Sequence, residues 1–457
     1  MSLRERLGEN QLTPSALGPE SGRGALGSTA YQKLKVELHK QLLDRIDLDV
    51  MSKLGDDRLR DELRALVERL IIEQGVALNS TERRQVVDDI ENEVLGFGPI
   101  EALLRDSSVS DILVNGAKQV YVERRGKLEL TGVRFDSDQH LMKIIDKIVA
   151  RVGRRVDESS PMVDARLPDG SRVNAVIPPL ALDGPVLSIR KFAARPLGMA
   201  DLLTYRSLTQ DMSQLLQGMV QARMNILISG GTGTGKTTML NVLSASIPAD
   251  ERVVTIEDAA ELQLQQPHVV RMETRPPNIE GKGEISQRAL VRNALRMRPD
   301  RIVLGEIRGA EAFDMLQAMN TGHEGSMCTV HANTPRDALA RIENMLGMAG
   351  LSLPAKGMRQ QIASAVHAVI QIARLTDGTR KLVSVSEVTG MEGDMITMQE
   401  VFAFQQQGVD KDGSVMGTYK ATGVRPRFVD RLRVHGIKLP DAIFDPARVQ
   451  MIRGAAA

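Results

Sequence analysis

A glycine-rich segment at residues 230–237 constrains the fold of this chain more than any other part of its sequence. It reads Gly-Gly-Thr-Gly-Thr-Gly-Lys-Thr and matches the pattern G-x-x-x-x-G-K-[ST]. It directly follows the apolar stretch 225–228 and precedes the helical run 238–245. The motif requires this strand–loop–helix context, so the segment predicts an α/β domain with the loop at the end of a strand. The alternative reading is a flexible glycine turn.

The residue types in this loop suit the phosphates of a nucleoside triphosphate. Glycines let backbone N–H groups curl around phosphates, and the N-terminus of the following helix attracts anions. Lys236 would add a positive charge at the outer phosphates, and the Thr237 hydroxyl would bind Mg²⁺. We therefore predict ATP and Mg²⁺ as cofactors. The predicted binding residues are Gly230, Gly231, Thr232, Gly233, Thr234, Gly235, Lys236, Thr237 and Thr238.

Two carboxylates follow other apolar stretches of the same region. Glu257 ends one such stretch and Glu306 ends another. Near-continuous apolar strands that alternate with helices indicate a parallel sheet buried on both faces, and the carboxyl ends of its strands meet at one ligand-binding edge. One carboxylate could hold Mg²⁺ through water and the other could polarise the attacking water. A carboxylate at the surface is the alternative for each. The predicted strands are 225–228, 253–256, 302–304 and 327–330.

Two histidines, His323 and His331, flank the last of these predicted strands. A strand separates them, so a joint metal site is not expected. Each histidine could be structural, or could sense phosphate from its end of the strand. Cys328 lies between them in an apolar run and is the single cysteine of the chain, so we expect a buried core residue and no disulfide.

The rest of the chain divides by pattern into further modules. Leucines and valines at helical spacing predict three amphipathic helices before residue 96, and Asn79 with Glu82 resembles a capping box at the start of the third. These helices form either a docking module or a plain three-helix bundle. Short strands and one helix then indicate an α+β domain. The predicted domains are a disordered tail (1–30), the helical module (31–95), the α+β domain (96–192), a linker (193–203) and the α/β domain (204–457).

Composition narrows the function classes. The formal net charge is +1, aromatic residues make up 3% of the chain and tryptophan is absent. These values argue against a nucleic-acid-binding protein, which would carry a basic surface or stacking aromatics. No apolar run approaches the length of a membrane span, and the N-terminus lacks a signal-peptide core. We therefore expect a cytoplasmic protein that is not inserted in the membrane.

Four ordered segments together resemble the secretion ATPase superfamily, which includes pilus motors and type IV secretion ATPases. The similarity comprises a Walker A box (230–237), an aspartate box (255–262), an atypical Walker B box (298–308) and a histidine box (321–334). Within the superfamily the chain is most similar to CpaF-type ATPases of Tad/Flp pili. Residues 95–101, 112–116, 169–175 and 188–192 carry that finer similarity. The resemblance covers about residues 30 to 390, and the remainder weakly.

The resemblance implies a homo-hexameric ring of RecA-like motor domains, each preceded by a PAS-like α+β domain on a flexible linker. ATP would bind between the two domains, where Arg172 and Arg190, and less clearly Arg166, would reach the phosphates. His331 would belong to the catalytic set. Gly305 stands where a magnesium aspartate is typical, so Glu306 would hold Mg²⁺ through water, and Glu257 would position the attacking water.

For function, the resemblance implies a motor that powers assembly of a Tad/Flp type IV pilus or a type II-like secretion system, and it leaves open whether the motor also powers retraction. Its partners would be polytopic platform proteins at the cytoplasmic face of the inner membrane. Two alternatives remain open. One is a nucleic-acid-translocating or type IV secretion ATPase. The other is a scaffold whose site no longer turns over ATP.

Overall fold

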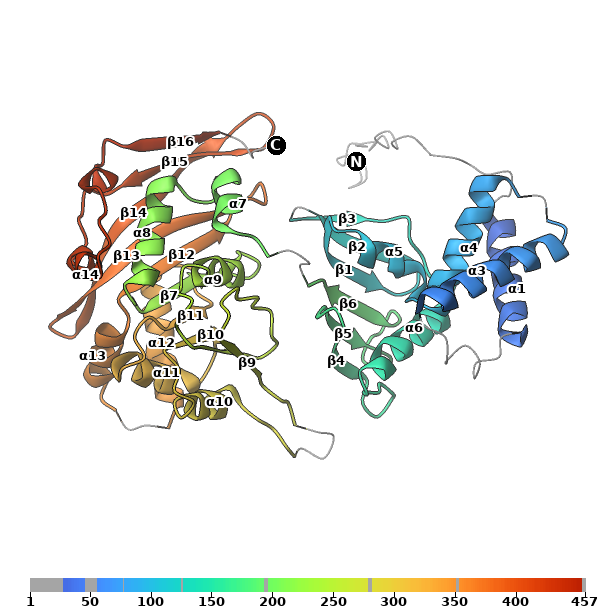
Figure 1. Cartoon of the computed structure of the whole chain (residues 1–457), viewed down its shortest axis with the longest axis horizontal. Helices are drawn as coiled ribbons and strands as arrows, with labels where there is room; N and C mark the ends of the chain where they lie inside the picture. Colours follow the sequence, from blue (N-terminus) through green and yellow to red (C-terminus); the bar gives the residue numbers. More distant parts are fainter. Residues whose placement is uncertain are drawn as a thin grey trace, which may run out of the picture. The chain divides into compact units, whose positions relative to one another are not determined.

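The computed structural model describes residues 28–45, 56–76, 78–124, 126–192, 196–277, 282–350 and 353–453. The chain divides into two compact units, each of which can be followed in Figure 1. The first unit is Met1–Glu123, Leu128–Leu167 and Ser171–Lys191, and most of the second is Phe192–Ala457. The predicted disordered tail lies outside the described residues, except that its end already belongs to the first helix.

Three helices at the start of the first unit pack around one apolar cluster. Leu38, Leu63 and Ile90 of this cluster are almost inaccessible to solvent. The predicted capping box is confirmed, because Asn79 Oδ1 accepts the Glu82 N–H at 2.8 Å and Glu82 Oε2 accepts the Asn79 N–H at 3.0 Å. The helices are α1 (Ser28–Arg45), α3 (Asp56–Glu73) and α4 (Ser80–Val94).

The rest of the first unit is an α+β domain, which confirms the predicted fold class for this part of the chain. Its six-stranded sheet has the order β3-β2-β1-β6-β5-β4. Helix α6 packs Ile144 and Ile148 into one core with Ile112 and Val114 of the sheet. The elements are η2 (Gly98–Ile100), α5 (Glu101–Arg105), β1 (Val109–Asn115), β2 (Gln119–Arg124), β3 (Lys127–Leu130), α6 (Asp138–Arg151), β4 (Met162–Arg166), β5 (Arg172–Val176) and β6 (Val186–Arg190).

Helix α6 also ties the helical module to the α+β domain. Lys147 Nζ donates to the carbonyl oxygens of Glu93 at 3.0 Å and Val94 at 2.8 Å, and Arg151 donates to the carbonyl of Leu95 at 2.7 Å. These carbonyls lie at the C-terminal end of α4, where helical partners are missing and positive charge is favourable. The two parts of the first unit are thus joined by cations that cap a helix.

The second unit is built on a ten-stranded sheet of order β16-β15-β14-β13-β12-β7-β11-β10-β8-β9. Within this order, each strand of the series β12-β7-β11-β10-β8-β9 is parallel to the next. Leu227 packs into the core on one face of this sheet and Ile228 into the core on the other, so helices cover both faces. The predicted α/β class is confirmed, and Cys328 is buried in the core as expected.

The parallel part of the sheet uses the four predicted strands and two that sequence reasoning did not identify, β9 and β12. The strands are β7 (Ile226–Gly230), β8 (Val253–Glu257), β9 (Val269–Glu273), β10 (Arg301–Ile307), β11 (Met327–Val330) and β12 (Ala368–Arg374). Helix α8 (Gln210–Gln221) precedes β7, and the helices between the strands are α9 (Lys236–Ser244), α10 (Gln287–Ala294), α11 (Glu311–Asn320), α12 (Pro335–Met348) and α13 (Ala355–Ala365).

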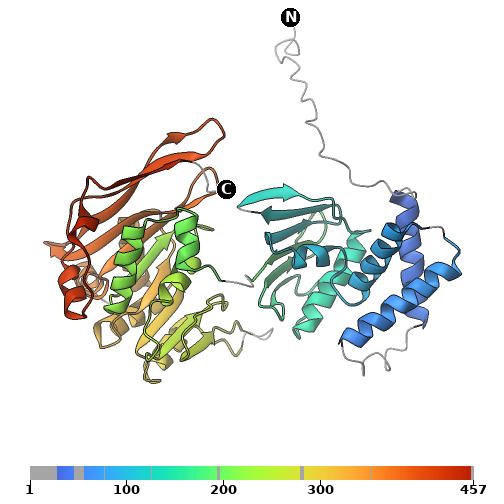
Figure 2. The same ribbon diagram turned by 45° about the horizontal axis from the view of Figure 1, so that its top comes forward.

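A long antiparallel extension continues the sheet beyond β12, as Figure 2 shows. Sequence reasoning did not identify its strands, because they mix polar and apolar residues and lack a clean alternation. Its elements are β13 (Arg380–Glu392), β14 (Met395–Val409), β15 (Val415–Ala421), α14 (Phe428–Val434), η3 (Asp441–Phe444) and β16 (Val449–Arg453).

The predicted linker at 193–203 requires a correction, because helix α7 (Met199–Thr204) begins within it. Asp201 Oδ2 accepts the Gly198 N–H at 2.8 Å and so satisfies a backbone donor at the start of this helix. Leu202 is buried in the core of the second unit. Residues 193–195 of the predicted linker lie outside the described residues.

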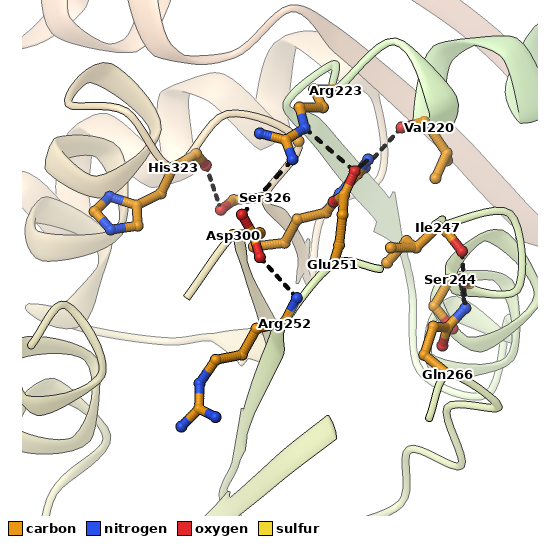
Figure 3. A network of polar contacts seen from close by, with 12 residues as sticks. Val220, Arg223, Ser244, Ile247, Glu251, Arg252, Gln266, Asp300, His323 and Ser326 are labelled. Carbon is orange, nitrogen blue, oxygen red and sulfur yellow. Dashed lines mark hydrogen bonds and ion pairs between the residues drawn. The ribbon is translucent and has the colours of Figure 1, made fainter. Parts of the chain in front are cut away.

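A buried ion-pair network fixes the amino-terminal edge of the parallel sheet (Figure 3). Arg301, at the start of β10, is 0% exposed and pairs through two nitrogens with the carboxylate of Glu251. Its third contact is the carbonyl of Val220 at 2.6 Å, at the end of α8. Arg223 also pairs with Glu251, at 3.2 Å. A buried charge needs such complete pairing, so the network joins α8, β8 and β10 rigidly at this edge.

None of the helices in the described parts of the chain is both long enough and apolar enough to cross a bilayer.

Candidate nucleotide site

The glycine-rich loop connects β7 to α9 at the carboxyl edge of the sheet. Gly233 has φ 68° and Gly235 has φ 96°, values that side-chain-bearing residues rarely adopt. A Cβ added to Gly230 would lie 2.5 Å from Thr234 Oγ1 and 2.7 Å from the carbonyl oxygen of Ile372. No larger residue fits there without displacing backbone. Gly235 precedes α9 without a side-chain cap, so the first N–H groups of that helix point at the loop.

Lys236 occupies the first turn of α9 and bends back over the loop. Its Nζ donates to the carbonyl of Gly231 at 2.9 Å. Burial lowers the pKa of the Lys236 ammonium, and the Glu306 carboxylate partly offsets this effect. Thr237 and Thr238 follow on the same turn and are half-buried. The loop, the lysine and the helix N-terminus together make a cradle for an anion.

Glu257 lies at the end of β8 and is only 3% exposed. Its Oε2 accepts the N–H groups of Glu261 at 2.8 Å and Leu262 at 3.0 Å. Its Oε1 is buried and has no hydrogen-bond partner. Burial raises the pKa of the Glu257 carboxyl to about 7. A buried carboxylate with one unused oxygen and such a pKa suits a group that orients a water molecule or takes its proton.

The side chain of Glu257 also explains the glycine at position 305. Leu304 of β10 pairs with Ile256 of β8, which places Gly305 beside Glu257. A Cβ on Gly305 would lie 2.8 Å from Cγ of Glu257. The space in which an aspartate at 305 would begin is therefore taken by the side chain of Glu257. Thr329 of β11 donates to the Gly305 carbonyl at 2.6 Å and holds this part of β10 in place.

Glu306 is the residue after Gly305 on β10. It pairs with Arg308, a cation that sequence reasoning missed. Its Oε2 lies 3.0 Å from Arg308, and Arg308 lies 3.3 Å from Asp258 of the aspartate box. Arg308 thus bridges the second and third boxes. Its position two residues after Glu306 was visible in the sequence, but only the fold shows that Asp258 lies within reach.

The two histidines lie at opposite edges of the sheet. Val330 pairs with Ser229, so His331 follows β11 at the level of Gly230 and near the loop. His323 precedes β11 and therefore belongs to the amino-terminal edge, where its carbonyl accepts the Ser326 hydroxyl (Figure 3). The suggestion that both could sense phosphate is therefore wrong for His323 and still open for His331.

Two further residues contact the site from β12 and β13. Gln371 is buried, and its side-chain amide donates to the carbonyls of Ala332 at 3.2 Å and Asn333 at 3.1 Å, just after His331. Arg380 donates to the carbonyl of Gly233 at 2.9 Å. A glutamine in the otherwise apolar stretch 368–373 is a signal that sequence reasoning could have used for the first residue.

The predicted arginines form a row in the first unit. Arg172 of β5 pairs with Arg190 of β6 on one side and with Arg166 of β4 on the other. Residues directly opposite in a sheet share a face, so the three arginines occupy adjacent positions on one face of the sheet. Arg190 also pairs with Asp111 of β1, with 3.1 Å between Nε and Oδ1. Adjacent like charges repel each other, so this row favours an anion nearby.

Comparison with known proteins identifies relatives over most of the chain. The family model described as "Type II/IV secretion system protein" matches residues 93–425. A Mycobacterium tuberculosis protein named for conjugal transfer is 38% identical over 310 residues, which cover 66% of this chain and 88% of that protein. The type IV secretion system protein VirB11 of Bartonella henselae is 32% identical over 319 residues, covering 61% and 88%.

Among solved structures, the pilus retraction motor PilT with bound ADP matches with a TM-score of 0.47 and 19% identity, covering 74% of this chain and 86% of that chain.

We predict that Gly305→Ala lowers nucleoside triphosphate turnover by displacing Glu257. The new methyl group would collide with Glu257 Cγ, and overpacking of this kind costs about 1–3 kcal/mol when neighbours move. Turnover and binding of a fluorescent triphosphate should be measured separately. We expect turnover to fall while binding persists. Gly347→Ala in α12, where an added Cβ meets nothing within 4 Å, is the control and should leave turnover unchanged. Equal turnover in both variants would contradict the role of this contact.

A second prediction concerns the pH dependence of stability. The folded pKa of Glu257, about 7, lies above its ordinary value of 4.5, so between these values the folded state binds more protons than the unfolded state. The free energy of unfolding therefore falls as pH rises through this window. Relative to Glu257→Gln, which has no such proton, the wild-type melting temperature should drop between about pH 5 and about pH 8.

The melting temperatures should be compared without nucleotide or Mg²⁺, because Mg²⁺ would favour the ionised carboxylate and a bound nucleotide would itself raise the melting temperature. Glu284→Gln removes an exposed carboxylate of the same domain and serves as the matched control. A difference between wild type and Glu257→Gln that stays constant with pH would contradict the prediction.

Proposed function

The chain belongs to the type II/IV secretion system protein family, and we propose that it is an ATP-hydrolysing, ring-forming motor of such a system. One observation carries the proposal. The loop after β7, Glu257 at the end of β8, Glu306 on β10 and His331 after β11 all lie at the carboxyl edge of one parallel sheet. Ligands of open α/β sheets bind at this edge.

Two observations on the loop support ATP and Mg²⁺ as its ligands. Position 230 admits no side chain, so the backbone can approach phosphate closely, and Lys236 lies over the loop. Mg²⁺ in such sites keeps substrate phosphates and water among its ligands. The Thr237 hydroxyl would bind it directly and Glu306 through water. When bound, the metal neutralises charge that develops on the phosphates.

Glu257 would act on the attacking water. Its buried, unpartnered Oε1 can accept a water proton as a hydrogen bond, while the two backbone N–H groups on Oε2 fix the orientation of the carboxylate. Arg308 holds Glu306 against Asp258 and so orders the metal side of the site. His331 would contact the outer phosphate from the end of β11.

The arginine row would complete the site from the first unit. Guanidinium forks match phosphate oxygens, and charge that develops in the transition state is best stabilised by donors already in place. Arg172 and Arg190 therefore take the catalytic role, with Arg166 beside them. In a homo-hexamer the row can come from the same or from a neighbouring subunit.

We further propose that the machine is a Tad/Flp-type pilus, for which the motor would drive assembly or retraction from the cytoplasmic face of the inner membrane. Polytopic platform proteins would be its partners, and the helical module of α1, α3 and α4 would be the docking surface. The motifs at 95–101, 112–116, 169–175 and 188–192 support this finer assignment. A conjugation or type IV secretion motor is the second candidate, favoured by the names of the relatives.

An ATPase assay tests the proposal. Lys236→Ala should reduce turnover to background, and Glu306→Gln should lower it strongly while binding of ATP remains. Hydrolysis that survives in Lys236→Ala would show that the site is wrongly assigned. Adding DNA and, separately, platform proteins distinguishes the candidates. Stimulation by DNA alone would favour the translocation motor over the pilus motor.

The arginine row makes its own prediction in this assay. Arg172→Ala and Arg190→Ala should each lower turnover by about 10²-fold or more, the typical effect of removing a donor to the transition state. Arg134→Ala changes an exposed arginine of the same domain outside the row and is the control. Turnover equal to that of the control would remove the row from the mechanism.

A further inference from the structure

The phosphate-binding loop is held from outside by the first residue of β13. Arg380 Nε donates to the Gly233 carbonyl at 2.9 Å. Its Cδ lies 3.4 Å from the position that a Cβ on Gly235 would take. Gly233 and Gly235 are the two loop residues with positive φ, so Arg380 contacts the loop where its curvature is set. A displacement of the loop on binding phosphate would therefore be transmitted to the start of β13.

The next residue, Lys381, holds a different element. Its side chain is 2% exposed, and its Nζ donates to the carbonyls of Arg206 at 2.9 Å and Tyr205 at 3.3 Å. These carbonyls lie at the C-terminal end of α7, where a cation is favoured by unpaired carbonyls and the helix dipole. Burial lowers the pKa of Lys381 to about 8, so the ammonium is still mostly charged at neutral pH.

The segment after α7 is anchored to the extension at a second point. The Leu382 N–H donates to the Ser207 carbonyl at 2.8 Å, and the Tyr419 hydroxyl donates to the same oxygen at 2.6 Å. Tyr419 is buried on β15. Strands β13 and β15 therefore bind the end of α7 and the residues after it through the Leu382 N–H, the Tyr419 hydroxyl and the Lys381 ammonium group.

The contacts made by Arg380 and by Lys381 are connected through a short, hydrogen-bonded stretch of backbone. Successive side chains of a strand point to opposite faces, so Arg380 and Lys381 reach different elements from adjacent positions. The start of β13 is fixed by its pairing with β12, and Ile372 of β12 pairs with Gly230. The backbone between the two side chains is thus part of a hydrogen-bonded ladder that also holds the loop.

We propose that Arg380 and Lys381 are positioning residues that couple the phosphate-binding loop to helix α7, so that phosphate occupancy sets the position of α7. Helix α7 is the first helix of the second unit, whose long continuous segment begins at Phe192. Coupling through a shared strand lets the nucleotide act on the segment that leads into the motor domain. The inference rests on the proposed binding of ATP.

The test is amide hydrogen exchange on the full-length chain without nucleotide, with ADP and with a non-hydrolysable ATP analogue. In the wild type we expect nucleotide to slow exchange both in the loop and α9 (230–244) and in α7 with the residues after it (199–207). In Arg380→Ala and in Lys381→Met, protection of the loop should persist and protection of α7 should be lost. Turnover should show a lower kcat with little change in KM, because binding is kept.

Arg433→Ala and Lys411→Met are the matched controls, since both change exposed residues of the same extension. They should retain the wild-type response of α7. Arg380 is exposed, so its substitution leaves the core intact and keeps the test valid even where Lys381→Met fails to fold.

The outcomes separate the two proposals. No protection of the loop in the wild type would refute nucleotide binding itself. Protection of the loop without any response of α7 in the wild type would overturn the coupling alone. A wild-type response of α7 in Arg380→Ala and in folded Lys381→Met would overturn the role of these residues.

Discussion

The contact between Glu257 and the bare Cα of Gly305 is the constraint on which the chemistry of this domain depends. The parallel register of β8 and β10 places the two residues side by side, and only a glycine leaves room for the Glu257 side chain. The carboxylate is thereby buried, oriented by two N–H groups and left with one unused oxygen. Because position 305 on β10 has no side chain, strand β8 supplies the buried carboxylate of the site.

The two edges of the parallel sheet differ in how Arg301 on one side and Glu257 and Gln371 on the other are hydrogen-bonded. At the amino-terminal edge, Arg301 is completely buried and its charge is met by Glu251 and a helix C-terminus. At the carboxyl edge, Glu257 and Gln371 each keep a buried oxygen without a partner in the described structure. Unsatisfied polar groups are costly in a core, so a ligand or water at this edge would stabilise these two oxygens by donating to them. The rigid edge holds the strands in the register that the open edge requires.

Sequence reasoning found the parts of the site that local pattern determines. The loop, Glu257 and Glu306 each end an apolar strand, and their convergence follows from parallel strand geometry. It missed Arg308, Gln371 and Arg380, because their partners are distant in the sequence and are brought close only by folding. The antiparallel extension was missed for a related reason. Its strands are stabilised by pairing with neighbours, and their own residues alternate weakly.

The extension links a loop of eight residues to other elements of the second unit. A phosphate-binding loop alone closes around its ligand and moves little else. Here β12 and β13 contact the loop, the segment after His331 and the end of α7 through Gln371, Arg380 and Lys381. Strands in one ladder move together because each shares its hydrogen bonds with the next. Under the proposed coupling, a hairpin that touches all three elements would convert a small displacement at the phosphates into a displacement of helix α7, which is the motion that the proposed motor function requires.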